Sequence, residues 1–383
     1  MAKLGEVCIQ ITDGSHNPPS GVEQSEYLML SSKNIDDDFI TLDSPRFLSH
    51  SDYLAENKRT TVSEGDLLMT IVGTIGRVAI VPEELKGICL QRSVAVIKPE
   101  REVVNNRYLM YQLQNMRPFL EKEARGVAQK GIYLKQVSQL DIKLPELEHQ
   151  MQIVKVLDKA SKLIFLRRQQ LAKLDELIKA RFVEMFGDPV NNPMNYPKSQ
   201  LGKVCDVRDG THDSPEYYDV GYPLVTSKNV TGGKIDLSEC NLISEDDYKK
   251  ICERSKVDRG DIIMPMIGTV GKPVIVNTEP MFAIKNVALI KFTPDSLVTN
   301  IYIKTLLESD YFDRAVLDKI RGGTQKFIAL GDIRKLEIIL PDLKHQQCFS
   351  TFVERVNQQK QTVQQSLEKL ELMKKALMQE YFG

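Results

Sequence analysis

The chain contains an approximate copy of itself. Short segments of the first half return in the second half in the same order, displaced by 193 to 197 positions. The repeated pairs are Leu4–Cys8 and Leu201–Cys205, Asp13–His16 and Asp209–His212, Ser31–Ile35 and Thr226–Val230, Gly65–Val81 and Gly260–Val276, and Leu144-Pro145 and Leu340-Pro341. This period far exceeds the ~20–50 residues of a solenoid repeat, so each half has the size of a domain. Two related domains in one chain indicate pseudo-two-fold symmetry and a target with two related parts.

Composition and charge narrow the class of protein. Of the 383 residues, 42% are hydrophobic and 27% are charged, as is usual for soluble globular domains. No run of about 18 apolar residues is present, and Met1–Gly5 has no apolar signal core, so we expect a cytoplasmic protein without a membrane span. The net charge of −1 counts against nucleic-acid binding by bulk electrostatics alone, so a DNA contact would require locally clustered charge or a partner.

The sequence shows no convincing catalytic, nucleotide or metal site. The six cysteines form no Cys-x-x-Cys pair, and no Cys/His cluster has zinc spacing, so we expect no metal. Asn17–Ser20 lacks the aromatic residue of an amino-methyltransferase motif, and Gly268–Lys272 has its glycines too close together for a P-loop. Ser15 and His16 are neighbours, but no acid can be assigned to complete a triad. We therefore expect a non-catalytic chain with no cofactor of its own.

Each half has the same three sections: a mixed region, a Leu-Pro boundary and a long helix. The mixed region alternates β-branched runs with turn residues, which is typical of strands joined by turns. Strands are predicted at Asp66–Val72, Arg77–Val81, Ser93–Ile97, Asp261–Ile267, Lys272–Val276 and Asn286–Ile290, and shorter helices at Asn106–Glu121 and Asn300–Leu317. The long helices are predicted at Glu148–Phe186 and Lys344–Phe382.

Both long helices carry apolar residues at alternating spacings of four and three, the pattern of a coiled coil. The expected interface consists of Ile153, Leu157, Ala160, Ile164, Leu171, Leu174, Ile178, Met185, Phe349, Val353, Val356, Val363, Leu367, Leu370, Leu377 and Tyr381. Arg167 and Arg181 interrupt the first seam, and Lys360 and Lys374 interrupt the second at different heptads. Since each helix is apolar where the other is interrupted, we expect the two helices to pair with each other.

These patterns predict an α+β fold with two pseudo-two-fold-related mixed α/β domains separated by an antiparallel two-helix coiled coil. The expected domains span residues 1–147 and 201–343. The long helices span 148–187 and 344–383, and a Pro/Asn-rich linker spans 188–200.

The order of these motifs, present twice, resembles one known family. A Gly-Asp strand runs into Gly-Thr-x-Gly at Gly65–Gly76 and Gly260–Gly271. A Gly-x-x-Gln-Lys element follows at Gly126–Lys130 and Gly322–Lys326. Together with the Leu-Pro boundaries and long helices, this order closely resembles the specificity subunit of type I restriction–modification systems, over essentially the whole chain.

The resemblance implies a DNA-reading scaffold. Each domain would read one half of a bipartite, asymmetric target in double-stranded DNA, while the helices would set the spacer and dock two modification (methyltransferase) subunits. Restriction (translocase/nuclease) subunits would join them, and S-adenosylmethionine, ATP and magnesium are expected on those partners. Two alternatives stay open: the specificity component of a related bifunctional restriction enzyme, and a coiled-coil protein scaffold that binds no DNA.

The candidate DNA contacts fall into two groups: residues that the two halves share and residues in which they differ. If the halves read different sequences, shared polar residues should grip phosphate or hold the fold, and divergent residues should read bases. The candidate contacts are Ser15, His16, Lys33, Arg77, Arg92, Gln129, Lys130, Thr211, His212, Lys228, Lys272, Lys285, Gln325 and Lys326, with Arg92 aligned to Lys285. The divergent candidate base readers are Arg46, Lys58, Arg59, Arg125, Lys234, Arg254, Lys256 and Arg321. Alternatively, the Ser/Thr-His pairs simply bond the backbone of an Asp-Gly turn.

Overall fold

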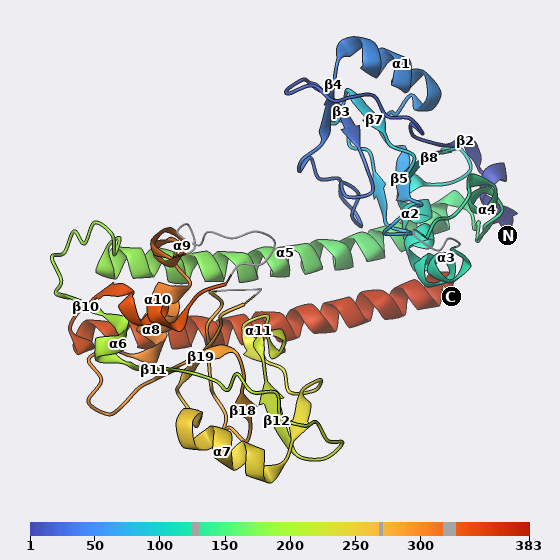
Figure 1. Ribbon diagram of the computed structural model, residues 1–383. Helices are drawn as coiled ribbons and strands as arrows, with labels where there is room; N and C mark the ends of the chain where they lie inside the picture. Colours follow the sequence, from blue (N-terminus) through green and yellow to red (C-terminus); the bar gives the residue numbers. More distant parts are fainter. Residues whose placement is uncertain (125–129, 268–270, 317–326) are drawn as a thin grey trace. The chain divides into compact units, whose positions relative to one another are not determined.

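The computed structural model describes residues 1–124, 130–267, 271–316 and 327–383 (Figure 1). It divides into two compact units, which we call unit 1 (residues 1–168 and 365–383) and unit 2 (residues 169–364). The two long helices, α5 (Leu147–Phe186) and α11 (Leu343–Phe382), each contribute to both units. The helices are divided at equivalent positions, because Arg168 and Gln364 differ by 196, an offset inside the repeat range.

Unit 1 is built on two small sheets. The four-stranded sheet has the order β2 (Cys8–Asp13), β8 (Val94–Pro99), β5 (Leu67–Thr70), β6 (Val78–Ile80), and all neighbours are antiparallel. The three-stranded sheet has the order β4 (Arg46–Leu48), β3 (Tyr27–Leu30), β7 (Ile88–Leu90), in which β3 and β7 are parallel. A short pair joins β1 (Ala2–Lys3) to β9 (Asp141–Ile142).

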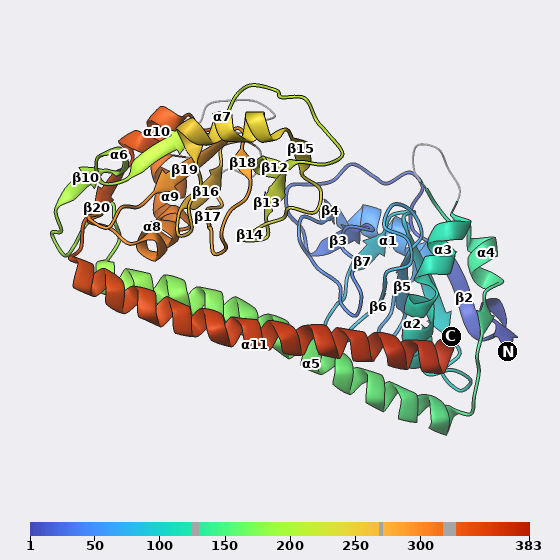
Figure 2. The ribbon, with the colours of Figure 1, turned by 90° about the horizontal axis from the view of Figure 1, so that it is seen from below.

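Short helices complete the described part of unit 1. They are the 3-10 helix η1 (Leu4–Glu6), α1 (His50–Thr60), α2 (Asn106–Asn115), α3 (Arg117–Glu123) and α4 (Leu134–Ser138). Helix α1 packs on β3 and β7 (Figure 2). Its position brings the end of α1 to the end of β2, where the first candidate site lies.

The two central strands of the four-stranded sheet of unit 1, β8 and β5, are buried on both faces. Successive strand residues point to opposite faces. Leu67 and Met69 of β5 therefore join the core formed with α2 and the long helices, whereas Leu68 joins the core beneath the three-stranded sheet. This explains why β5 is an uninterrupted apolar run in the sequence rather than an alternating one.

Unit 2 repeats this architecture. Its sheets have the orders β11 (Asp206–Asp209), β19 (Val287–Lys291), β16 (Ile262–Pro265), β17 (Val274–Ile275), and β15 (Asn241–Ile243), β12 (Tyr222–Val225), β18 (Ala283–Ile284). The short pair β10 (Lys198–Gln200) and β20 (Glu337–Ile339) matches β1 and β9, and the hairpin β13 (Val230–Thr231) and β14 (Lys234–Ile235) is additional. The helices are α6 (Leu201–Val204), η2 (Ser227–Asn229), α7 (Glu245–Ser255), α8 (Asn300–Leu307), α9 (Asp310–Ala315) and α10 (Leu330–Lys335). The expected pair of similar α+β domains is confirmed.

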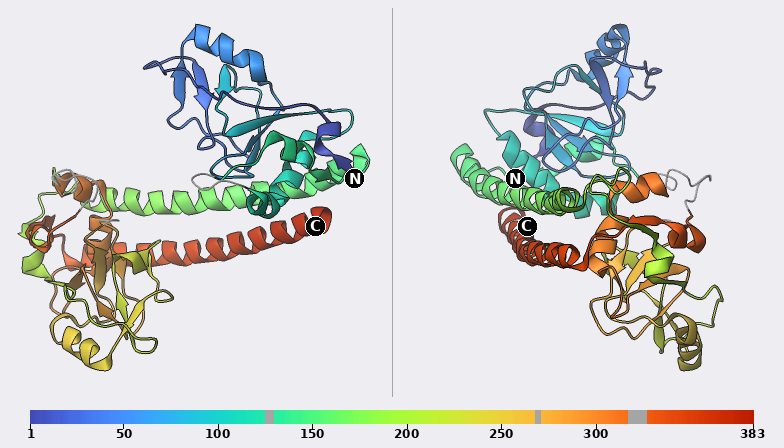
Figure 3. Two further views of the ribbon diagram at one scale, coloured as in Figure 1. Left: turned by 45° about the vertical axis from the view of Figure 1, so that its right-hand side comes forward. Right: turned by 90° about the vertical axis from the view of Figure 1, so that its left-hand side faces the viewer.

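The long helices pack against each other in antiparallel fashion in both units (Figure 3). In unit 1 the start of α5 lies beside the end of α11, and Arg168 Nη2 lies 2.7 Å from Glu371 Oε1. In unit 2 the end of α5 lies beside the start of α11, and Lys360 forms an ion pair with Asp175. The predicted antiparallel pairing is therefore confirmed, and Lys360, which interrupts its own seam, is compensated by the partner helix.

The burial of the expected interface residues follows the seam. The buried members are Ile153, Leu157, Ala160, Ile164, Phe349, Val353, Val356, Val363 and Leu367, and the half-buried ones are Leu171, Leu174, Ile178, Met185, Leu370, Leu377 and Tyr381. At the helix ends the buried side chains shift by one position, to Phe182, Phe186, Met378 and Phe382. There each helix packs into a domain core as well as against the partner helix, so the burial leaves the coiled-coil register.

The two predicted shorter helices are each broken in two. Helix α2 ends at Asn115 and α3 begins at Arg117, because Pro118 has no N–H to continue the helical bonding. In unit 2, Ser309 has extended backbone (φ −88°, ψ 160°) and separates α8 from α9. Leu317, the predicted end of the second helix, lies outside the described residues. Among the described helices, none is long and apolar enough to cross a lipid bilayer.

Candidate nucleic-acid interface

The repeated Asp-Gly-Ser/Thr-His segments build the same side-chain cluster in both units. Asp13 is the last residue of β2, and its Oδ2 lies 2.9 Å from Nε2 of His16. Asp209 is the last residue of β11, and its Oδ2 lies 2.9 Å from Nε2 of His212. Both aspartate side chains are only 11% exposed, whereas the histidine rings are 52% and 62% exposed. A buried carboxylate therefore orients a histidine toward solvent at the end of the first strand of each four-stranded sheet.

Glycine is required in this segment because the backbone approaches the neighbouring strand closely. A Cβ atom on Gly14 would lie 2.0 Å from the carbonyl oxygen of Leu90, and one on Gly210 would lie 2.4 Å from that of Ile284. The backbone N–H groups of Ser15 and Thr211 donate to the same two oxygens, at 2.7 and 2.9 Å. The hydroxyl-bearing residues are thus fixed by their backbone, while the imidazoles bond a carboxylate and not the turn backbone.

Each carboxylate also holds an arginine from the end of a helix. Arg59 of α1 donates from Nη2 to Oδ1 of Asp13 at 2.5 Å and from Nε to the Asp13 carbonyl oxygen at 3.2 Å. Arg254 of α7 donates to Oδ1 of Asp209. The assignment of these two arginines to divergent positions is therefore wrong, because they perform the same task. The signal was available in the sequence: the offset of 195 that relates Arg59 to Arg254 also relates Tyr53 to Tyr248.

The electrostatics of the second cluster reflect these bonds. Burial raises the pKa of the Asp209 carboxyl, but the hydrogen bond with His212 and the charge of Arg254 outweigh burial and hold this pKa below its ordinary value. Hydrogen bonds with Asn286 and then with Asp209 raise the pKa of the His212 imidazole. Nδ1 of His212 lies 2.8 Å from Oδ1 of Asn286, so both ring nitrogens are engaged.

The predicted alignment of Arg92 with Lys285 is also wrong. Ser15 bridges Gln91, and Thr211 bridges Lys285, so Gln91 is the counterpart of Lys285. Arg92 donates its backbone N–H to Ser15, as Asn286 does to Thr211, and the loop of unit 2 is then one residue shorter. Arg92 and Lys285 nevertheless both lie on the loop that follows β7 or β18 and adjoins the cluster.

The remaining shared candidates lie in several surroundings. Lys33 and Lys228 are exposed on loops fixed by a buried asparagine, Asn34 or Asn229, whose Oδ1 accepts from the backbone three residues earlier at 3.0 and 2.9 Å. Lys272 and Lys130 are exposed. Arg77 is half-buried, with Nη1 3.7 Å from Oδ1 of Asp36. Gln129, Gln325 and Lys326 lie outside the described residues, as do Arg125 and Arg321.

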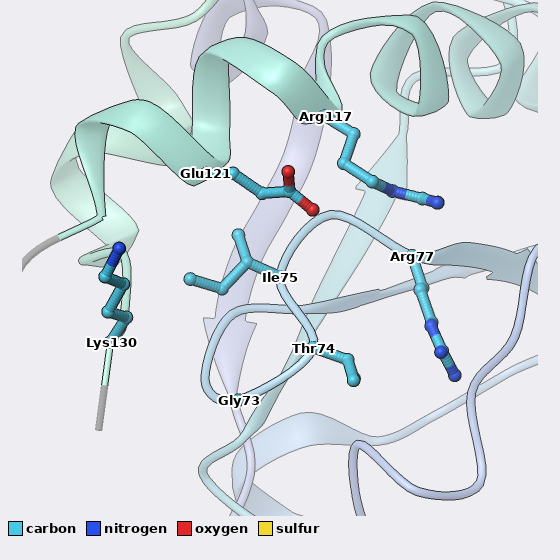
Figure 4. Close-up of a pocket in the computed structure, with 7 residues that line it drawn as sticks. All are labelled: Gly73, Thr74, Ile75, Arg77, Arg117, Glu121 and Lys130. Carbon is cyan, nitrogen blue, oxygen red and sulfur yellow. The ribbon is translucent and has the colours of Figure 1, made fainter. Parts of the chain in front are cut away.

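Arg77 and Lys130 line a pocket of about 390 Å³ beside the Gly-Thr-x-Gly turn of unit 1. Figure 4 shows Arg117 and Glu121 extending from α3, which lies above the turn, and Lys130 to the left of the turn. Arg117 donates to the Gly76 carbonyl oxygen at 3.1 and 3.2 Å and pairs with Asp37, so it fixes the turn. Arg117 and Glu121 are not among the predicted contacts, because neither belongs to the basic and polar residues that the two halves share.

The divergent candidate base readers are mostly surface side chains. Lys58 and Lys234 are exposed. Arg46 donates to the Pro19 carbonyl oxygen at 2.7 Å, and Lys256 lies 3.3 Å from Asp258. Lys58 and Lys234 therefore keep the most freedom to contact a ligand.

Comparison with known proteins identifies the class of protein to which two such domains and their paired helices belong. A family model described as "Type I restriction modification DNA specificity domain" matches residues 28–176 and again 193–372. The chain therefore belongs to the type I restriction–modification DNA specificity family, with two such domains. Its role is that of a DNA sequence-specificity subunit, which works with DNA and other subunits of a type I complex.

Individual relatives agree with this assignment. The type I restriction enzyme MjaVIII specificity subunit of Methanocaldococcus jannaschii is 24% identical over 341 residues, which is 84% of this chain and 79% of the relative. The EcoBI specificity subunit of Escherichia coli is 36% identical over 100 residues, or 26% of this chain and 21% of the relative. The fold matches the type I S subunit from M. genitalium at a TM-score of 0.56 and 12% identity, over 100% of this chain and 95% of that one. A chain from a study of type I R-M complex assembly matches at 0.55 and 18%, over 100% and 96%.

Proposed function

We propose that each domain of this chain reads one half of a bipartite, asymmetric DNA sequence. The observation that supports this proposal is that one scaffold occurs twice with different loops. In unit 1 the acidic loop Asp36–Asp38 faces Arg77 and Arg117, whereas the corresponding Thr231–Gly233 of unit 2 carries no acid. Two domains with the same fold but different surface loops suit two half-sites that are related but differ in sequence.

The paired helices would set the distance between the half-sites. Each has 40 residues and is therefore ~60 Å long at 1.5 Å per residue. Duplex DNA rises ~3.4 Å per base pair, so this length corresponds to more than one helical turn.

The same helices would dock two modification subunits. Exposed apolar side chains on α5, including Val156, Leu163, Phe165 and Leu166, support this role, because such a stripe is costly to leave in water. We further propose that the chain is non-catalytic and acts in the cytoplasm. S-adenosylmethionine, ATP and magnesium would then belong to the modification and restriction subunits.

Domain exchange tests the proposal. Residues 1–147 would be replaced by the corresponding domain of another family member, the chain would be co-expressed with its modification subunits, and methylation would be mapped by long-read sequencing. One half-site should change while the other stays the same, and exchange of residues 201–343 should give the reverse result. A change in both half-sites, or no methylation by the unaltered complex, would contradict modular reading.

A further inference from the structure

We propose that Arg59 and Arg254 grip DNA phosphate in the same way in both domains, each aimed by a buried aspartate, and that neither reads a base. The inference rests on the proposed function, because it assumes that both domains contact DNA. It adds the identity of a contact that the two domains share, and it names Asp13 and Asp209 as positioning residues.

The two clusters are built from equivalent elements in the two units. The aspartate ends the first strand of the four-stranded sheet, the glycine closes against the neighbouring strand, and the arginine comes from the end of the helix on the three-stranded sheet. A contact made identically in both domains cannot distinguish two different half-sites. It can only fix the register of the duplex, which is the task of phosphate contacts.

The aspartate orients each arginine without using all of its hydrogen-bond donors. A guanidinium carries five N–H donors, and Arg59 uses two of them on Asp13, one for the carboxylate and one for the carbonyl oxygen. The Arg59 side chain is 50% exposed and that of Arg254 is 65% exposed, so the remaining donors face solvent. Fixing a long side chain in advance removes part of the entropy that a phosphate contact would otherwise cost.

The local charge also favours a phosphate contact. Each aspartate bonds one histidine and one arginine, His16 and Arg59 in unit 1 and His212 and Arg254 in unit 2. The neighbouring loop, which carries Arg92 in unit 1 and Lys285 in unit 2, pairs through its backbone with the residue that precedes the histidine. With a neutral histidine, the arginine balances the carboxylate, and the basic residue on the neighbouring loop adds one positive charge to the same part of the domain. A chain of net charge −1 needs such local clusters if it is to contact a polyanion.

The salt dependence of DNA binding separates a phosphate contact from a base contact. Arg59→Gln and Arg254→Gln would be compared with Lys135→Gln and Lys250→Gln, which remove the same charge from exposed positions outside the two clusters. Binding of the complex with its modification subunits to its duplex target would be measured over a range of salt concentrations. Each arginine variant should make the slope of log K against log salt concentration shallower by about 0.9, with an unchanged methylation sequence. The lysine controls should change the slope less.

Replacement of the aspartate tests its positioning role. Asp13→Asn adds one positive charge to the cluster, so bulk electrostatics alone predicts tighter binding. If Asp13 positions Arg59, the variant should instead bind DNA several-fold more weakly, because the arginine side chain is no longer oriented. Arg59→Lys keeps the charge, so it should recover part of the salt dependence that Arg59→Gln loses. Thermal melting of each variant confirms that the fold is retained, and the second unit provides an independent copy of the experiment.

The outcomes distinguish this proposal from the proposed function. If Arg59→Gln relaxes or alters the recognised bases, the residue reads sequence and the proposal is wrong. If its slope equals that of Lys135→Gln, the cluster only supports the fold. If the unaltered complex binds no duplex at all, the proposed function itself fails.

Discussion

Replacement of Gln346 by alanine should loosen the attachment of α11 to its domain. This side chain is fully buried at the first turn of α11. Its Oε1 accepts from the backbone N–H of Thr299 at 2.8 Å, and its Nε2 donates to the carbonyl oxygens of Leu297 at 3.0 Å and Pro341 at 2.8 Å. Thr299 also caps α8, so one amide ties the start of both helices together.

The expected magnitude follows from these three hydrogen bonds. Each contributes about 1 kcal/mol net, and removal leaves one donor and two acceptors unpaired in the interior. Gln346→Ala should therefore lower the free energy of unfolding of unit 2 by about 3 kcal/mol, or roughly 100-fold in its unfolding equilibrium. Gln347→Ala, one residue along on the exposed side of the helix, should change it by less than about 0.5 kcal/mol.

Urea unfolding followed by circular dichroism would measure the difference. Gln150 makes the equivalent bonds to Asn105, Val103 and Pro145 in unit 1, so Gln150→Ala gives a second measurement in the other unit. Equal stability of Gln346→Ala and Gln347→Ala would show that the buried amide does not hold the helix, and the reasoning would fail.

Three further predictions use the same features. Seven residues inserted after both position 168 and position 364 lengthen the helix pair by ~10 Å, so mapped methylation sites should gain about three spacer base pairs with unchanged half-sites; unchanged spacing would refute a ruler. The raised pKa of His212 means that its contribution to stability is complete below its ordinary pKa near 6.5 and is lost as pH rises through the raised value. In an NMR titration Asn286→Ala should therefore lower this midpoint, and an unchanged midpoint would contradict the assigned cause. Gly210→Ala should destabilise unit 2 by about 1–3 kcal/mol in a thermal melt, whereas Gly331→Ala, which has open space, should not; equal melts would refute the steric argument.

The repeat made most of the fold predictable. Duplication predicted two similar domains, the apolar spacing of four and three predicted paired helices, and the run Leu67–Met69 predicted a buried strand. The errors lie where a tertiary contact overrides a local pattern. Pro118 breaks a helix whose apolar pattern continues through it, and Phe186 is buried in place of Met185 because the helix end packs into a domain core as well as against its partner.

The candidate site was less predictable because its members come from distant segments. The Asp-Gly-Ser/Thr-His motif was visible, yet its meaning depends on Arg59, 46 residues from Asp13. The motif also depends on the close approach of Gly14 to Leu90, which leaves no trace in composition or periodicity. The buried glutamines were overlooked for a similar reason, since a polar residue at the start of a helix ordinarily faces water.

The structural comparison of the two halves also changes which residues count as shared. In sequence, Arg92 and Lys285 seemed equivalent and Arg59 and Arg254 seemed divergent, and backbone pairing reverses both assignments. Arg92 instead occupies the place of Asn286, which engages Nδ1 of the histidine in unit 2. Both domains thus contain the same cluster of aspartate, histidine and arginine. The residue next to this cluster differs, being Arg92 in one domain and Asn286 in the other. Since a phosphate contact fixes the register from which neighbouring side chains reach the bases, this variable position is where we expect the two half-sites to begin to differ.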